Sequence, residues 1–332
     1  MTSSFERWVR FWDQRESPTS LCAARVLVGL ALFGDLVYAE LIGARTAAWA
    51  PPPAGLGWGA TGAQLPLAAR LFGANAETAS LLFWVALGAS LSFAFGALFR
   101  PAALVLVAAL TELAQFAPDG DRGIDKLLRL VVIVLALSAA GQRWSFDAWL
   151  RRRLGCAAPE QAPAWPRYLL FAQLCWTYFS AAHNRGGRAW WPQGGFSALA
   201  QILGDPHMAR FTPGLVTPIY PLLQVATALT MLFELSAPLM MLITFLDRHP
   251  GRGGRAGDWV RRLRLRWVWL TVGICMHLGI ALTMRLGVFP FGILALYPLL
   301  LHPEELERGA ERFACRLRRR AAPGLAESER DE

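Results

Sequence analysis

The chain has 332 residues, of which 55% are hydrophobic and only 17% are charged, and its mean hydropathy is +0.34. This composition excludes an ordinary water-soluble enzyme, because the apolar residues form runs of roughly 17 to 25 residues, the length of a helix that crosses a bilayer. The net charge of +9 does not indicate a nucleic-acid-binding protein, because the arginines lie in short loops between apolar runs and form no single basic face. We therefore expect an integral membrane protein whose partner is the lipid bilayer, with no nucleic-acid partner.

The N-terminal segment has the pattern of a helix that lies on the membrane surface. Within residues 4–13, Phe5, Trp8 and Trp12 fall on one helical face and charged side chains on another. The first apolar run begins near residue 20 and is not followed by a small-residue cleavage site. We therefore expect this run to stay in the membrane as the first span.

The remaining apolar runs predict an all-α, polytopic bundle of about eight transmembrane helices. With eight spans, the arginine-rich segments all lie on the cytoplasmic side of the membrane, where basic residues are favoured. An odd number of spans would put one of these segments on the opposite side. The segments are 143–167, 248–266 and 316–320. The predicted location is a bacterial inner membrane, with both termini in the cytoplasm. The predicted spans are 20–41, 77–98, 101–117, 126–141, 166–183, 217–246, 266–284 and 287–302.

Three regions follow from these spans. We expect a cytoplasmic interfacial helix in residues 1–19, the transmembrane domain in residues 20–302, and a charged cytoplasmic tail in residues 303–332 that ends in a disordered acidic stretch. Two outer segments, residues 45–76 and 184–216, are too long for simple turns and contain tryptophans, which favour the membrane interface.

Ionisable residues within the spans are the candidates for function, because a charge near the bilayer centre costs on the order of 3 kcal/mol and needs a partner. Glu234 lies near the middle of its span, where an ion pair with Arg25 is one explanation and a role in proton handling or ligand binding is another. His277 is either a hydrogen-bonded packing residue or a proton relay. No second His or Cys stands at ligand spacing, so we expect no metal site. Other candidates are Asp35, Glu112, Asp125, Lys126, Arg129 and His183.

Four segments in order resemble the HTTM domain, a membrane fold found in bacterial proteins and in vitamin K-dependent gamma-carboxylase. The first is the opening span with Arg25 and Asp35, and the second is the span that ends in a Trp-Ser-Asp run beginning at Trp144. The third is a segment of Tyr and small residues followed by Trp191-x-x-Gly194, and the fourth joins the spans that carry Glu234 and His277.

This resemblance implies the HTTM membrane fold, but it supports the carboxylase reaction poorly. In the carboxylase, a lysine after the Tyr-small segment deprotonates reduced vitamin K. The corresponding place here holds Asn184 or Arg185, with His183 next to it. Asparagine does not titrate, and arginine, with a pKa above ~12, is not a general base.

The leading hypothesis is a polar pocket inside the bundle that opens to the outer face and binds a quinone-like or lipidic ligand. The predicted ligand-binding residues are Arg25, Glu234, Trp191 and Gly194. An alternative is a quinol-linked oxidoreductase or carboxylase-like enzyme, in which His183, Arg185 and His277 handle protons. A small-molecule transporter is a third possibility. The sequence identifies neither a cofactor nor an oligomeric state.

Overall fold

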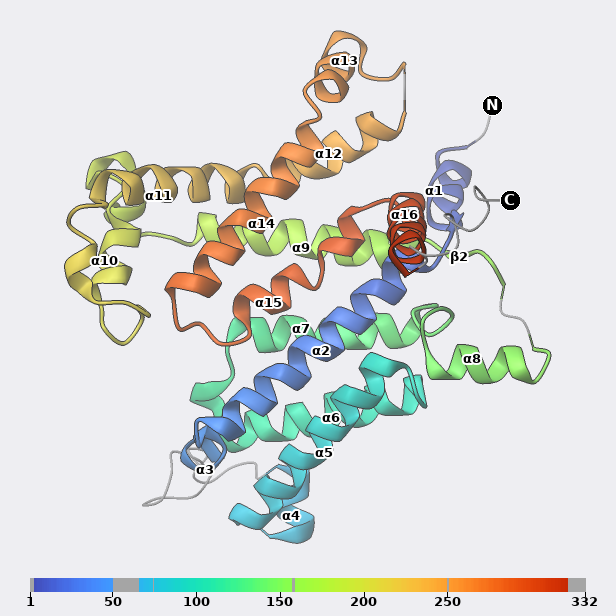
Figure 1. The fold of residues 1–332 in the computed structure, drawn as a ribbon, viewed down its shortest axis with the longest axis horizontal. Helices are drawn as coiled ribbons and strands as arrows, with labels where there is room; N and C mark the ends of the chain where they lie inside the picture. The colour runs from blue at the N-terminus through green and yellow to red at the C-terminus, as the bar shows by residue number, and fades with distance from the viewer. Residues whose placement is uncertain (1–2, 50–65, 74, 157–158, 250, 322–332) are drawn as a thin grey trace, which may run out of the picture.

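The structure is a computed structural model that describes residues 3–49, 66–73, 75–156, 159–249 and 251–321. Within these residues the fold is nearly all-α, as predicted (Figure 1). The α-helices are α1 (Ser4–Trp12), α2 (Thr19–Leu41), α3 (Ala44–Trp49), α4 (Leu67–Phe72), α5 (Ala76–Phe95), α6 (Phe99–Phe116), α7 (Gly123–Leu137), α8 (Phe146–Arg153), α9 (Trp165–His183), α10 (Ala198–Gly204), α11 (Tyr220–Leu235), α12 (Ala237–Arg248), α13 (Gly254–Arg262), α14 (Leu265–Thr283), α15 (Phe289–Leu294) and α16 (Pro303–Ala321). Short elements complete the fold: strands β1 (Arg15–Glu16) and β2 (Ala162–Pro163), and 3-10 turns η1 (Pro118–Gly120), η2 (Arg188–Trp190), η3 (Pro192–Gly194), η4 (Pro213–Leu215) and η5 (Tyr297–Leu300).

Four of the described helices, α2, α5, α6 and α14, are long and apolar enough to cross a membrane. A fifth candidate is the pair α11 and α12, which bends by 61° at a short break. The expected spans at 126–141 and 287–302 correspond to shorter helical segments, because α7 has 15 residues and the apolar stretch Phe289–Leu300 is also short. α9 has 19 residues but is not among the helices apolar enough to qualify. The structure therefore supports a membrane protein with four or five candidate spans, and the number eight stays a prediction.

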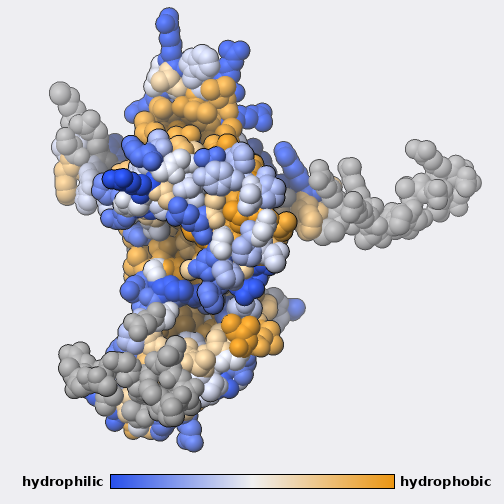
Figure 2. All heavy atoms as spheres, turned by 90° about the vertical axis from the view of Figure 1, so that its left-hand side faces the viewer, coloured by the Kyte–Doolittle hydropathy of each residue, from blue (hydrophilic) through white to orange (hydrophobic). Residues whose placement is uncertain are grey.

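The two ends of the bundle carry different short helices. Figure 1 shows α1, α8 and α16 near the two chain termini, and α3, α4 and α10 toward the opposite end. Large apolar side chains such as Leu27, Leu81 and Leu232 are exposed on the long helices, and Figure 2 shows broad apolar patches separated by polar side chains. Apolar surface of this extent suits contact with lipid. The outer segment 45–76 and the tail lie partly outside the described residues.

Helix α2 is the central element of one half of the bundle, where it packs against α5, α7 and α15. A glycine permits its closest contact: a Cβ atom on Gly29 would lie 2.7 Å from Cα of Ala94 in α5. Helix α5 ends at Gly96, which adopts the left-handed conformation with φ of 63° that ends many helices. Small residues thus allow α2 and α5 to approach closely, as is common for helices packed within a membrane.

Long-range polar contacts close the end of the bundle near the termini. Strands β1 and β2 pair antiparallel, and the buried side chains of Glu16 and Arg167 form an ion pair with an Nε–Oε1 distance of 2.5 Å. Glu307 of α16 accepts hydrogen bonds from Ser17 at 2.6 Å and Thr19 at 2.7 Å, and it also pairs with Arg143. These contacts tie α16 to the N-terminal end of α2.

We predict that Glu307→Gln weakens this attachment and lowers stability at pH 7 by on the order of 1 kcal/mol, because the hydrogen bonds to a charged acceptor are lost. Partial burial opposes ionisation, but the hydrogen bonds from Ser17 and Thr19 and the charge of Arg143 hold the pKa of Glu307 below its ordinary value. The ionised carboxylate therefore stabilises the fold fully at pH values above the ordinary carboxyl pKa of about 4.3. This stabilisation is lost as the pH falls through the lowered pKa that Glu307 has in the folded protein. Thermal unfolding of the detergent-solubilised protein should show a difference between wild type and variant that shrinks on acidification. A difference that grows toward low pH would contradict this.

Candidate functional site

Arg25 is fully buried, but it does not pair with Glu234. Its guanidinium donates hydrogen bonds to the backbone carbonyls of Phe93 (3.1 Å), Ala94 (2.9 Å) and Trp144 (2.6 Å). Two of these carbonyls belong to the last turn of α5, where helical carbonyls lack partners and the helix dipole favours a cation. The predicted ion pair between Arg25 and Glu234 is therefore wrong. The ligand-binding role of Arg25 stays a prediction.

Glu234 pairs instead with Arg185. Both Nη atoms of Arg185 donate to the carboxylate, one of them at 2.9 Å. Glu234 stands near the end of α11, next to the break before α12, and Arg185 lies just beyond α9. The Glu234 side chain is only 7% exposed and that of Arg185 is 23% exposed. A bidentate ion pair of this kind holds the start of segment 184–216 against α11.

Trp191 and Gly194 belong to the same cluster. The Arg185 guanidinium lies over the ring of Trp190, 4.0 Å from its centroid, and the indole of Trp191 donates to the Arg185 carbonyl at 3.0 Å. A Cβ atom on Gly194 would come within 2.3 Å of the carbonyl oxygen of Arg188. Glycine is thus required for the tight turn that places the two tryptophans beside the ion pair.

His277 lies in a second buried cluster, between two tyrosines. The Tyr178 hydroxyl lies 2.7 Å from Nε2 of His277 and 2.9 Å from the Tyr297 hydroxyl. The other ring nitrogen of His277, Nδ1, is buried and has no hydrogen-bond partner among the described residues. His183 is exposed and stacks on Phe179, with ring centroids 5.9 Å apart. The structure does not place His183 in this hydrogen-bonded chain.

Aromatic rings connect the two clusters. Phe233, the neighbour of Glu234, meets the Tyr178 ring edge-on at 5.0 Å and stacks on Trp269 at 4.1 Å. Gly273 makes room for this packing, since a Cβ atom there would lie 2.2 Å from the Tyr297 hydroxyl oxygen. Sequence reasoning missed both tyrosines because an aromatic residue in an apolar span is indistinguishable from a packing residue.

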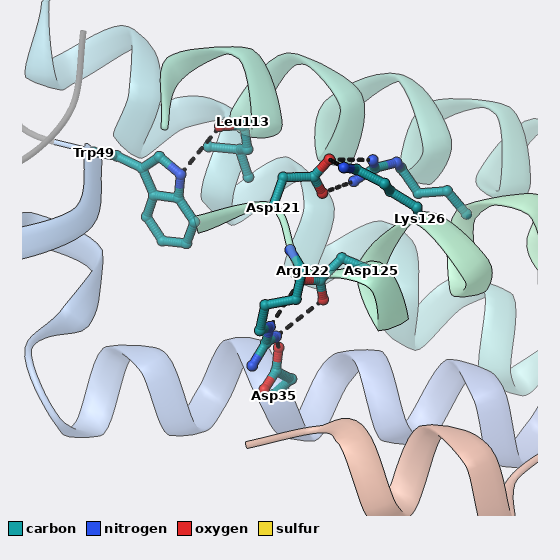
Figure 3. A network of polar contacts seen from close by, with 8 residues as sticks. Asp35, Trp49, Leu113, Asp121, Arg122, Asp125 and Lys126 are labelled. Carbon is teal, nitrogen blue, oxygen red and sulfur yellow. Dashed lines mark hydrogen bonds and ion pairs between the residues drawn. The ribbon is translucent and has the colours of Figure 1, made fainter. Parts of the chain in front are cut away.

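A third polar group lies toward the end of the bundle that carries α3 and α4, and it lines a cavity of about 250 Å³. Figure 3 shows Arg122 between Asp35 of α2 and Asp125 of α7; its Nη2 lies 2.9 Å from Asp35, and its Nε lies 2.8 Å from Asp125. Hydrogen bonds to Asp125, with the charges of Asp35 and Asp125, raise the pKa of Arg122 above its ordinary value, so the guanidinium stays cationic. Nearby, Asp121 accepts two hydrogen bonds from Arg129, at 2.8 and 2.9 Å.

This cavity at Arg122 adjoins an apolar groove of about 510 Å³ between α2 and α15. Both spaces are lined by Asp35, Tyr38 and Gly287. Gly287 has a φ of 56°, and a Cβ atom on it would lie 2.6 Å from Nη1 of Arg122. A larger residue would therefore strain the backbone and displace the arginine. The sequence singles out Asp35 and Asp125 one by one, but nothing in it shows that residues 35, 122 and 287 meet.

We predict that Arg185→Gln destabilises the protein by about 3 kcal/mol, because it leaves the Glu234 carboxylate buried without a counter-charge. Glu234→Gln should cost less, since the partly exposed arginine still reaches water. The double variant should be more stable than the sum of the single effects predicts. Thermal unfolding in detergent measures all three, with Arg188→Gln, an exposed site in the same segment, as the matched control. Strictly additive effects would contradict the ion pair.

Comparison with known proteins identifies the fold family. The HTTM domain matches residues 14–249, which include the Arg185–Glu234 pair and the ion pairs of Arg122. No curated protein matches the chain. No solved structure matches it either. Because the family match covers more than half of the sequence, the chain belongs to the HTTM domain family of membrane proteins.

Proposed function

We propose that this membrane protein binds a quinone-like or lipidic ligand, with the apolar tail in the groove between α2 and α15 and the polar head at Arg122. The observation that carries the proposal is the junction of an apolar groove with a charged cavity through three shared residues, Asp35, Tyr38 and Gly287. Such a pairing of an apolar space with a few convergent polar groups is typical of sites for amphipathic small molecules.

The groove has the dimensions and the lining that a lipid tail requires. Its volume of about 510 Å³ falls within the usual range of small-molecule pockets, roughly 300 to 1,000 Å³. On α2 it runs from Leu27 to Tyr38, about 16 Å of helix at 1.5 Å per residue. Phe291 and Leu294 line the opposite wall. The exposed side chains of Leu27, Leu30 and Phe291 indicate that the groove is open at the surface of the bundle, where a lipid-soluble molecule can enter.

Arg122 offers unused hydrogen-bond donors to a ligand head. Its Nε and Nη2 atoms are engaged by Asp35 and Asp125. Its Nη1 atom, next to Gly287, donates no hydrogen bond within the described part of the chain. Guanidinium N–H groups suit a quinone carbonyl or a lipid phosphate. The two aspartates fix the guanidinium while leaving this edge available to an acceptor.

We predict that Gly34→Phe lowers binding of a decyl-substituted benzoquinone by at least about tenfold, the equivalent of 1.4 kcal/mol. Gly34 lines the groove, and a Cβ atom on it meets no atom within 4 Å, so the ring fills the groove without a clash at Cβ. Gly88→Phe is the matched control, because Gly88 is an exposed helical glycine of α5 with the same free space around its Cβ position and lies outside the groove. Quenching of tryptophan fluorescence in detergent measures the affinity. Equal binding by both variants would contradict the assignment.

A quinol-linked oxidoreductase is a second candidate, favoured by the hydrogen-bonded chain of Tyr297, Tyr178 and His277. Nδ1 of His277 is buried without a hydrogen-bond partner among the described residues. Such a chain can carry a proton from a quinol hydroxyl. We predict that any oxidation of added quinol, with ferricyanide as the electron acceptor, falls by about a hundredfold in Tyr178→Phe. His249→Ala, at an exposed histidine beyond α12, should leave the rate unchanged. Quinol that binds without being oxidised would reject this candidate and leave the binding proposal intact.

A further inference from the structure

A second cavity, separate from the groove, opens near the chain termini. Its volume is about 890 Å³, and it lies between the loop that follows α7 and helix α8, at the end of the bundle shared with α1 and α16 (Figure 1). Arginines and aromatic residues line it, among them Arg143, Arg151, Arg152 and Trp144. None of these residues belongs to the proposed ligand groove or to the clusters around Glu234 and His277.

The arginines of this cavity differ in whether their guanidinium groups have a hydrogen-bond or ion-pair partner. Arg143 pairs with Glu307, and Arg151 donates to the Gly141 carbonyl at 2.8 Å. Arg152 is exposed, and its side chain makes no hydrogen bond or ion pair within the described ranges. The acidic side chain among the described lining residues is Glu160. The cavity therefore keeps an excess of positive charge with free guanidinium donors, which suits a phosphate group.

Aromatic side chains line the cavity together with these arginines or lie on the adjacent helix α8, and they indicate the membrane interface. Trp144, Phe146 and Trp149 are half-exposed, a pattern that favours the level of the lipid headgroups. Trp144 has a φ of 48°, unusual for a bulky residue. The buried Arg25 holds this backbone, because its Nη2 donates to the Trp144 carbonyl at 2.6 Å. The fold thus maintains a strained tryptophan at the cavity, and strain of this kind persists where the surrounding structure fixes it.

We infer that this cavity binds the phosphate headgroup of an anionic phospholipid from the leaflet at the end of the bundle that carries the termini. Arg151 and Arg152 contact the phosphate, and the aromatic residues lie beside the upper part of the acyl chains. The combination of arginines that keep unused donors with interfacial aromatic residues favours a lipid over a soluble anion, which has no apolar part to bury.

Native mass spectrometry of the purified full chain tests this inference, with phosphatidylglycerol and phosphatidylcholine as probes. We expect phosphatidylglycerol to bind more tightly, and Arg152→Gln to weaken its binding about fivefold, the effect of one arginine near an anionic membrane surface. Arg151→Gln combined with Arg152→Gln should weaken it about 25-fold. Arg255→Gln, at an exposed position of α13 outside the cavity, is the matched control and should have no effect.

Two results would overturn the inference. One is unchanged phosphatidylglycerol binding in the Arg152→Gln variant, whose exposed side chain makes no hydrogen bond or ion pair with the described residues. The other is saturable binding of inorganic phosphate at the cavity with no preference for phosphatidylglycerol over phosphatidylcholine, which would assign the cavity to a soluble anion. Because this site shares no residue with the groove, the quinone affinity should stay constant in both arginine variants whichever result is obtained.

Discussion

The burial of charge within apolar helices is the constraint on which this structure depends. Each ionised side chain that lies between the helices has to be satisfied there, because lipid offers neither hydrogen bonds nor a high dielectric constant. Arg25 meets this requirement with backbone carbonyls at the end of α5, and Glu234 meets it with Arg185. These two arrangements have different consequences. The hydrogen bonds of Arg25 fix the end of α5, and the ion pair of Glu234 with Arg185 joins α11 to the segment that follows α9.

The same constraint explains how the ends of the bundle are held. Near the termini, Arg167 binds Glu16, and Arg266 pairs with Asp247 at 3.0 Å and also with Glu305, so α16 and β1 are attached through charges. At the opposite end, Arg122 joins α2 to α7 through Asp35 and Asp125. Of these ion pairs between described residues, those of Arg122 line a cavity next to an apolar groove, which makes this group the better candidate for a ligand site.

Much of this arrangement follows from the sequence. Hydropathy gives the membrane character and the all-α fold, and the order of four segments gives the family, which the match over residues 14–249 confirms. Those local patterns also place Arg185, Trp191 and Gly194 in one segment.

The partner of Glu234 could not be predicted, because hydropathy locates a charge along a span but does not show which way the side chain points. An ion pair with Arg25 is one explanation from the sequence, since both buried charges need a partner. In the structure, backbone carbonyls accept the hydrogen bonds of the Arg25 guanidinium instead. The cavity at Arg122 depends on residues as distant in the sequence as 35, 122 and 287, whose meeting is decided by helix packing and by a glycine with a positive φ.

An experimental structure of the full chain in a lipid nanodisc, prepared with the decyl-substituted benzoquinone, tests the central claim most directly. The account predicts elongated density along α2 from Leu27 to Tyr38, with a polar end within hydrogen-bond distance of Nη1 of Arg122. A groove closed by side chains, or a ligand bound at another site while Arg122 contacts only Asp35 and Asp125, would contradict it.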